Sequence, residues 1–170
     1  MRIREYRSDD CAAMERLFGD TVRTVNAADY RAEQLEAWAG GLIDREAWNI
    51  RFLRTHTLVA VGSDETVEPD GTLRPDHAVI GFGNIDASGY LDMLYVHRGH
   101  QREGVGSALC DALEAFAFSQ GAPCVETHAS LTARPFFEQR GYVAVCEQQV
   151  IRHGVALPNV VMRRAFASRL

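Results

Sequence analysis

The sequence predicts an α+β domain in which one mixed β-sheet of about seven strands carries helices on both faces. The first observation behind this prediction is the order of hydrophobic periods, which gives strand, helices, three strands, helix, strand, helix and two strands. The second is that the 170 residues contain no linker, repeat or low-complexity segment. A chain of this length buries about 70% of its unfolded surface in one core. We therefore expect residues 1–170 to form a single domain.

The first part of the chain begins with a strand and continues into helices. Charged and apolar side chains alternate over residues 2–7, which is the period of a half-buried strand. The segment Ser8–Asp10 holds residue types that favour a helix N-cap, and apolar residues then recur at helical spacing to about Asn26. Two more helices are expected over residues 32–38 and 44–54, separated by a pair of glycines that ends the first of them.

The rest of the chain alternates between strands and helices. The stretch 62–76 is rich in acids and turn residues, so we expect it to be the polar loop of a hairpin. Helices are expected over residues 103–119 and 131–140, the second of which ends at Gly141. The remaining strands are expected over residues 57–61, 78–85, 90–96, 123–128, 143–151 and 155–163.

Composition excludes several classes of function. The formal net charge is −5, which disfavours binding of nucleic acid because phosphate backbones require a basic face. All 18 basic residues are arginine, so mechanisms that need a catalytic lysine are excluded. No apolar run approaches the length of a membrane span, and the N-terminal residues lack the apolar core of a signal peptide.

Cysteine and histidine usage adds a compartment and excludes a metal site. The four cysteines lie far apart in the sequence and form no Cys-x-x-Cys pair, which fits reduced thiols in the cytoplasm. His97 and His100 are three residues apart, but no second ligand pair lies at zinc spacing. We therefore expect a cytoplasmic protein without a bound metal.

The segment most informative about function lies between an apolar strand and the helix that follows it. Gly104 and Gly106 open that helix, although each glycine costs about 1 kcal/mol relative to alanine there. Without a Cβ, the free amides of a helix start can approach an anion closely, and the helix dipole favours that anion. With Arg98 and Arg102 beside them, these residues form a site suited to a pyrophosphate. The alternative is that the glycines only bend the loop tightly into the helix.

Two motifs resemble those of a known family. Gln101, Gly104 and Gly106 spell Gln-x-x-Gly-x-Gly after an apolar strand, which resembles the acetyl-CoA signature of the GNAT acetyltransferases. Residues 130–142 resemble the later helix of that family, which ends in glycine and an aromatic residue. The expected order of elements fits the GNAT fold over essentially the whole chain. The amino-acid sequences of residues 30–38 and 129–142 are most similar to a YafP-like bacterial branch.

The resemblance implies a set of cofactor-binding residues. Ser130 stands where many relatives carry an asparagine that contacts the cofactor, and Phe137 stands where many carry a tyrosine that protonates the departing thiolate. The latter departure leaves the general acid in doubt. The backbone groups implied to hold the pantetheine arm are those of Leu94, Tyr95 and Val96. The amides implied to hold the pyrophosphate are those of Arg102, Glu103, Gly104, Val105, Gly106 and Ser107.

Transfer to an amine also requires a base, because amine pKa values lie near 10. Asp92 is the first candidate, since a carboxylate within an otherwise apolar strand is expensive to bury without a task or a partner. An acid paired with arginine for structure alone is the competing interpretation. Tyr90 and His128 are the alternative bases. The competing interpretation is that Tyr90 only packs its ring and that His128 is an ordinary surface histidine.

The function implied is transfer of an acetyl group from acetyl-CoA to an amine of a small molecule or peptide, by direct attack in a ternary complex. The alternative is a catalytically weak module that binds and senses acetyl-CoA, which Phe137 keeps open because it cannot donate a proton. We expect a monomer or homodimer that binds neither nucleic acid nor membrane.

Overall fold

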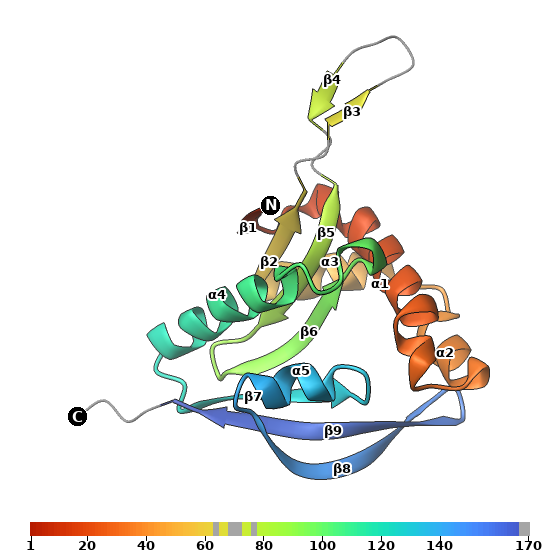
Figure 1. Ribbon diagram of the computed structural model, residues 1–170, viewed down its shortest axis with the longest axis vertical. Coiled ribbons are helices and arrows are strands. Elements are labelled where there is room, and N and C mark those ends of the chain that lie inside the picture. The colour runs from red at the N-terminus through yellow and green to blue at the C-terminus, as the bar shows by residue number, and fades with distance from the viewer. Residues whose placement is uncertain (63–64, 68–72, 76–77, 167–170) are drawn as a thin grey trace.

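The computed structural model describes residues 1–62, 65–67, 73–75 and 78–166 (Figure 1). A seven-stranded sheet in the order β1-β2-β5-β6-β7-β9-β8 forms its centre, which confirms the expected mixed sheet. Among the described residues, no helix is long and apolar enough to cross a membrane. The strands of the sheet are β1 (Arg2–Glu5), β2 (His56–Val61), β5 (Val79–Ile85), β6 (Tyr90–Val96), β7 (Cys124–Ser130), β8 (Val143–Arg152) and β9 (Val155–Ala165).

Helices cover both faces of the sheet. The apolar run along β2 requires this, because successive side chains of a strand point to opposite faces. Leu58 and Ala60 pack into a core beneath α4 (Val105–Ser119) and α5 (Arg134–Gln139). Val59 and Val61 face the other way, into a core beneath the first three helices. Those three helices are α1 (Cys11–Thr24), α2 (Ala32–Ala39) and α3 (Arg45–Arg54).

Two helices are shorter than the sequence predicts. The helix expected to begin at Glu103 begins at Val105, because Gly104 has a left-handed φ of 82° and cannot lie in the helix. The helix expected over residues 131–140 is reduced to α5. Pro135 has no N–H and is tolerated only in the first turn, so it fixes the start of α5 next to itself.

The stretch expected to be a polar loop carries structure of its own. β3 (Glu65–Val67) and β4 (Leu73–Pro75) pair antiparallel as a small two-stranded sheet. The expectation of a loop is therefore wrong for these residues, while residues 63–64, 68–72 and 76–77 lie outside the described part of the chain. β2 and β5 pair antiparallel, as a hairpin requires.

A buried acid fixes α4 to the C-terminal half of the sheet. The Glu114 carboxylate accepts hydrogen bonds from the Tyr142 hydroxyl at 2.8 Å, from Arg140 at 2.9 Å and from the Cys110 thiol at 3.2 Å. Arg164 of β9 completes an ion pair with it. Burial raises the pKa of Glu114, but the hydrogen bonds from Arg140, Cys110 and Tyr142 outweigh it and leave the pKa below its usual value.

One irregular strand opens the sheet. Among the described strands, β6 and β7 are the one parallel pair, and their register covers only Tyr90 opposite Glu126 and Leu91 opposite Thr127. On the other side of β6, Leu91 pairs with Ile85 and Met93 with Asn84, so Asp92 is an extra residue in a β-bulge. A bulge bends its strand, and beyond it β6 turns away from β7 (Figure 1).

Candidate active site

The parting of β6 and β7 creates the larger of two described hollows, a cavity of about 720 Å³. One wall is β6 from Leu91 to Val96, and the opposite wall is the end of β7. The loop before α4 closes one end, and α5 with the turn that precedes it closes another. The two motifs singled out in the sequence therefore meet across one cavity.

The start of α4 has the form of an anion site. The first amide that donates back along the helix is that of Ala108, which bonds the Gly104 carbonyl at 3.0 Å. The amides of Val105, Gly106 and Ser107 have no acceptor within the helix and stay available to a ligand. A Cβ on Gly106 would lie 3.5 Å from Val96 and 3.6 Å from Phe136, so glycine keeps this corner of the cavity open.

The Gln101 side chain, which lines the cavity, also holds the loop. Its side-chain amide donates to the Val96 carbonyl at 2.7 Å, and the Thr21 hydroxyl donates to the same carbonyl at 3.2 Å. Arg102, which follows, adopts a left-handed φ of 64°. Gly104 is left-handed too. Two left-handed residues therefore reverse the direction of the backbone just before α4, next to the cavity.

The backbone of β6 alternates between the cavity and β5. The His97 amide donates to the Ile80 carbonyl of β5 at 2.9 Å, so residues two apart from it face the same way. Tyr95 therefore turns its backbone groups toward β5, whereas Leu94 and Val96 turn theirs toward the cavity. The backbone groups of Leu94 and the amide of Val96 are thus open to a strand-like ligand, because Gln101 and Thr21 already bond the Val96 carbonyl. Tyr95 packs its ring against Phe18, with ring centroids 5.0 Å apart.

Two hydroxyl groups lie at the far wall of the cavity. The Ser130 hydroxyl accepts hydrogen bonds from the Ala133 amide at 3.0 Å and from Asn26 at 3.4 Å, which leaves its O–H to donate. The Thr132 hydroxyl is buried and has no partner among the described residues. A buried polar atom without a partner in a cavity wall fits a bound polar ligand. The sequence analysis missed Thr132 because it considered only the position at which relatives carry an asparagine.

The ring of Phe137 is 3% exposed and belongs to the core beneath α4 and α5, although it also lines the cavity. It packs edge-on against Phe136 and Tyr142, with centroids 5.1 and 5.0 Å away. The position of the expected general acid is therefore taken by a hydrocarbon ring that has no proton to donate.

The structure gives Asp92 a specific pair of partners. Arg51 of α3 forms an ion pair with its carboxylate, and the Asn84 side chain donates to it at 3.1 Å. Asp92 also lines the cavity where β6 leaves β7. Arg51 was not singled out in the sequence, since an arginine on the polar face of a helix is typical of a solvated surface.

The other two candidate bases lie together beside Asp92. The rings of Tyr90 and His128 meet edge-on at 5.3 Å. His128 contacts Gln148 through Nδ1 at 3.2 Å and lies 3.7 Å from Glu126 through Nε2. Burial, and then the negative charge of Asp92, raise the pKa of Tyr90, so its phenol stays protonated at neutral pH. That state suits a hydrogen-bond donor better than a base.

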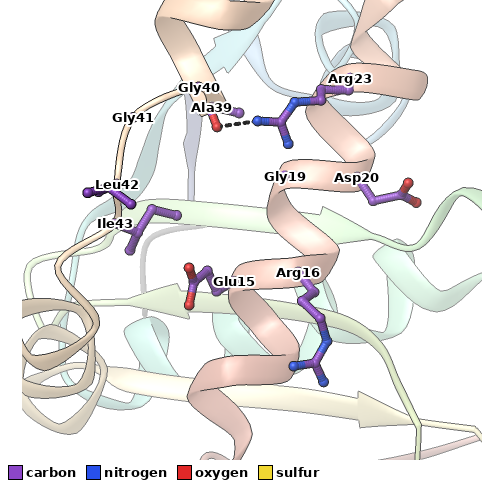
Figure 2. A pocket seen from close by; sticks show the side chains of 10 residues that line it. All are labelled: Glu15, Arg16, Gly19, Asp20, Arg23, Ala39, Gly40, Gly41, Leu42 and Ile43. Atoms are coloured by element: carbon purple, nitrogen blue, oxygen red, sulfur yellow. Dashed lines mark hydrogen bonds between the residues drawn. The ribbon is translucent and has the colours of Figure 1, made fainter.

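The smaller hollow, of about 440 Å³, lies away from this cavity, between α1 and the segment after α2 (Figure 2). Arg23 crosses it and donates to the Ala39 carbonyl at 2.7 Å. A Cβ on Gly19 would lie 2.9 Å from the Arg23 guanidinium, so glycine on α1 makes room for this contact. None of the residues singled out in the sequence lines it.

Comparison with known proteins decides the family. The sequence profile described as "Acetyltransferase (GNAT) domain" matches residues 26–164. The chain belongs to the GNAT acetyltransferases. Membership makes this GNAT chain an acetyl-CoA-dependent N-acetyltransferase, and the free amides of α4, the open corner at Gly106 and the unpartnered Thr132 hydroxyl fit that co-substrate.

Individual relatives agree with the family. The chain is 30% identical over 164 residues to the uncharacterized N-acetyltransferase YafP of Escherichia coli, covering 96% of this GNAT chain and 95% of YafP. A GCN5-related N-acetyltransferase from Rhodopseudomonas palustris superposes with a TM-score of 0.83 at 32% identity, over 97% and 95% of the two chains. The fold also matches YncA of Salmonella typhimurium, solved with acetyl-CoA, with a TM-score of 0.67 at 16% identity, over 100% and 96%.

Proposed function

We propose that this GNAT chain transfers the acetyl group of acetyl-CoA to an amine of a small molecule or peptide, by direct attack within a ternary complex. The observation that carries the proposal is the parting of β6 and β7, which joins two different chemistries in one cavity. Backbone amides suited to a pyrophosphate lie at the start of α4. A carboxylate, a phenol and an imidazole lie where the strands separate.

Acetyl-CoA supplies an acetyl thioester whose leaving group is a thiolate. Attack by the neutral amine forms a nitrogen–carbon bond, breaks the carbon–sulfur bond and leaves the electron pair on sulfur. Asp92 accepts the amine proton, directly or through a water, since its carboxylate lines the cavity beside the parting strands. Arg51 and Asn84 hold that carboxylate in place.

Phe137 donates no proton, so the thiolate leaves unassisted or receives a proton from another group. The conjugate acid of an alkyl thiolate has a pKa of roughly 8.5, by analogy with cysteine, which makes the thiolate a tolerable leaving group. The phenol of Tyr90, whose pKa is raised by burial and by the charge of Asp92, is a candidate for that group. Backbone N–H groups of β6 that face the cavity stabilise the developing negative charge on oxygen.

Replacement of Asp92 tests this proposal. We expect Asp92→Asn to lower the rate of free-CoA release in the presence of a panel of amines by roughly 10²–10⁴-fold, while the affinity for acetyl-CoA stays the same. Glu15→Gln is the matched control, because it removes the carboxylate from another arginine pair, that of Arg45, outside the cavity.

Near-normal turnover of Asp92→Asn would move the role of the base to His128 or Tyr90. Absence of CoA release by the natural protein with every amine, together with tight binding of acetyl-CoA, would favour the sensing module instead.

A further inference from the structure

The face of the sheet opposite α4 and α5 carries a lateral row of polar side chains. Tyr90 of β6 pairs in register with Glu126 of β7, and Glu126 pairs with Arg163 of β9. Their strand neighbours, among them Leu91 and Met162, point into the core beneath α4. The row therefore faces the other way, one residue from the point at which β6 and β7 part.

Arg51 of α3 lies at the β6 end of the same row. Its ion pair with Asp92 lies beside Tyr90, and the charges of Asp92, Arg51 and Glu126 all act on the Tyr90 hydroxyl. At the other side, Arg163 forms an ion pair with Glu126. Two arginine–carboxylate pairs thus flank one tyrosine on this face of the sheet, and Asp92 of one pair also lines the cavity.

The two pairs are asymmetric in what they present to a ligand. The carboxylate side chains of Asp92 and Glu126 are 15% and 28% exposed, whereas Arg51 and Arg163 are 45% and 54% exposed. The acids are therefore covered and the guanidinium groups are open.

Hydrogen bonding shows the same asymmetry. Asp92 already accepts from Arg51 and Asn84, and Glu126 accepts from Arg163. Arg51 donates to Asp92 through Nη2, and Arg163 donates to Glu126 through Nε. A guanidinium has five N–H donors. Both arginines thus keep donors for a planar anion, and the Asp92 carboxylate keeps acceptor capacity for one amine.

We infer that the acceptor of this chain is an amine that also carries a carboxylate, an amino acid or short peptide, and that Arg163 and Arg51 bind its carboxylate while its amine lies at Asp92. This inference rests on the proposed function. Two strand spacings, about 10 Å, separate the backbones of β6 and β9. An arginine side chain spans part of that width, so the amine and carboxylate of the acceptor are separated by few bonds.

The test compares acceptors that differ only in this charge. Free-CoA release is measured with an amino acid, with its amide and with a diamine of similar length. We expect kcat/KM to be about 10- to 100-fold higher for the amino acid than for its amide, the range expected for hydrogen bonds to a charged group. Arg163→Gln is expected to remove most of this preference. Arg45→Gln, which disturbs an arginine pair outside the cavity, is expected to keep it.

A binding measurement separates this inference from the proposed function. In calorimetry on the CoA-loaded protein, the N-acetylated amino acid is expected to bind at least about 10-fold more tightly than its N-acetylated amide. This readout needs no turnover, so it decides the inference even if no amine releases CoA. Equal binding of the two, or a preference for the diamine, would overturn the inference and leave acetyl transfer to amines standing.

Discussion

The two ends of the cavity are built in different ways. The end at the start of α4 consists of backbone amides from one short segment, Arg102–Ser107, with glycine where a side chain would intrude. The end at the parting of β6 and β7 consists of side chains of these two strands, and their carboxylates Asp92 and Glu126 pair with Arg51 of α3 and Arg163 of β9. The first end depends on backbone dihedral angles and the second on which side chains four separate elements happen to carry.

This difference teaches how one fold keeps a co-substrate and changes its acceptor. A substitution in α3 or β9 alters Arg51 or Arg163 without touching the dihedral angles of Arg102 and Gly104. Conversely, a side chain larger than that of alanine at Gly106 extends into the first end. The acceptor end is therefore free to vary while the co-substrate end is not.

The largest expected effect is at the backbone end. Gly106→Val is expected to weaken binding of acetyl-CoA roughly 100-fold, because its added carbons would lie against Val96 and Phe136 and fill the open corner. Gly106→Ala adds only an ordinary contact and is expected to lose less. Calorimetry measures the affinity and circular dichroism checks the fold. Unchanged affinity in the valine variant would contradict the assignment of the acetyl-CoA pyrophosphate to the start of α4. Gly104 serves less well, since its φ of 82° strains valine whatever binds.

A smaller effect is expected from the unpartnered hydroxyl of Thr132 in the far wall of the cavity. Thr132→Val is expected to weaken binding of acetyl-CoA about 5- to 10-fold and to leave the free energy of unfolding unchanged or higher by up to about 1 kcal/mol, since it removes an unpartnered buried hydroxyl. Thr57→Val is the opposite case, because the Thr57 hydroxyl donates to the Phe52 carbonyl at 2.8 Å. It is expected to lose stability and keep affinity. Loss of stability in Thr132→Val would show that the hydroxyl has a partner.

The smallest effect is expected between the two ends. Phe137→Tyr keeps the ring packing and is expected to change the rate of acetyl transfer only a few-fold, because the thiolate leaves tolerably well without an acid. Steady-state CoA release measures it, with Phe136→Tyr as the control for an added hydroxyl. A rise of 100-fold or more would show that the natural chain is impaired in transfer and would favour the sensing module.

The same contrast explains what the sequence could predict. Strand and helix periods are local, so the seven strands of the sheet and their succession along the chain followed from them, and so did the glycine-rich start of α4. The left-handed Arg102 carries no local signal, because any residue type other than glycine is uncommon there. The helix start was placed two residues early because the left-handed φ of Gly104 was not predicted either.

The acceptor end was predictable only in part. Asp92 stood out as an acid in an apolar strand, but its partner Arg51 lies 41 residues away on an amphipathic helix whose pattern gives no direction for a long side chain. The row from Tyr90 to Arg163 depends on the pairing of β6, β7 and β9. Such pairings follow from topology and not from the spacing of residues along the chain.

The short register between β6 and β7 has a consequence for the cooperativity of unfolding. Two residue pairs join a block of β1, β2, β5 and β6 to a block of β7, β9 and β8, whereas strands within each block share at least four. Glu114 of α4, through Arg140 and Tyr142, and Gln34 of α2, through the Ala156 carbonyl of β9, add further connections. Separation of the blocks is then the low-energy opening of this molecule, which exposes amides near the cavity to hydrogen exchange without global unfolding. A ligand lying along the gap touches both blocks, so its binding free energy opposes that opening directly.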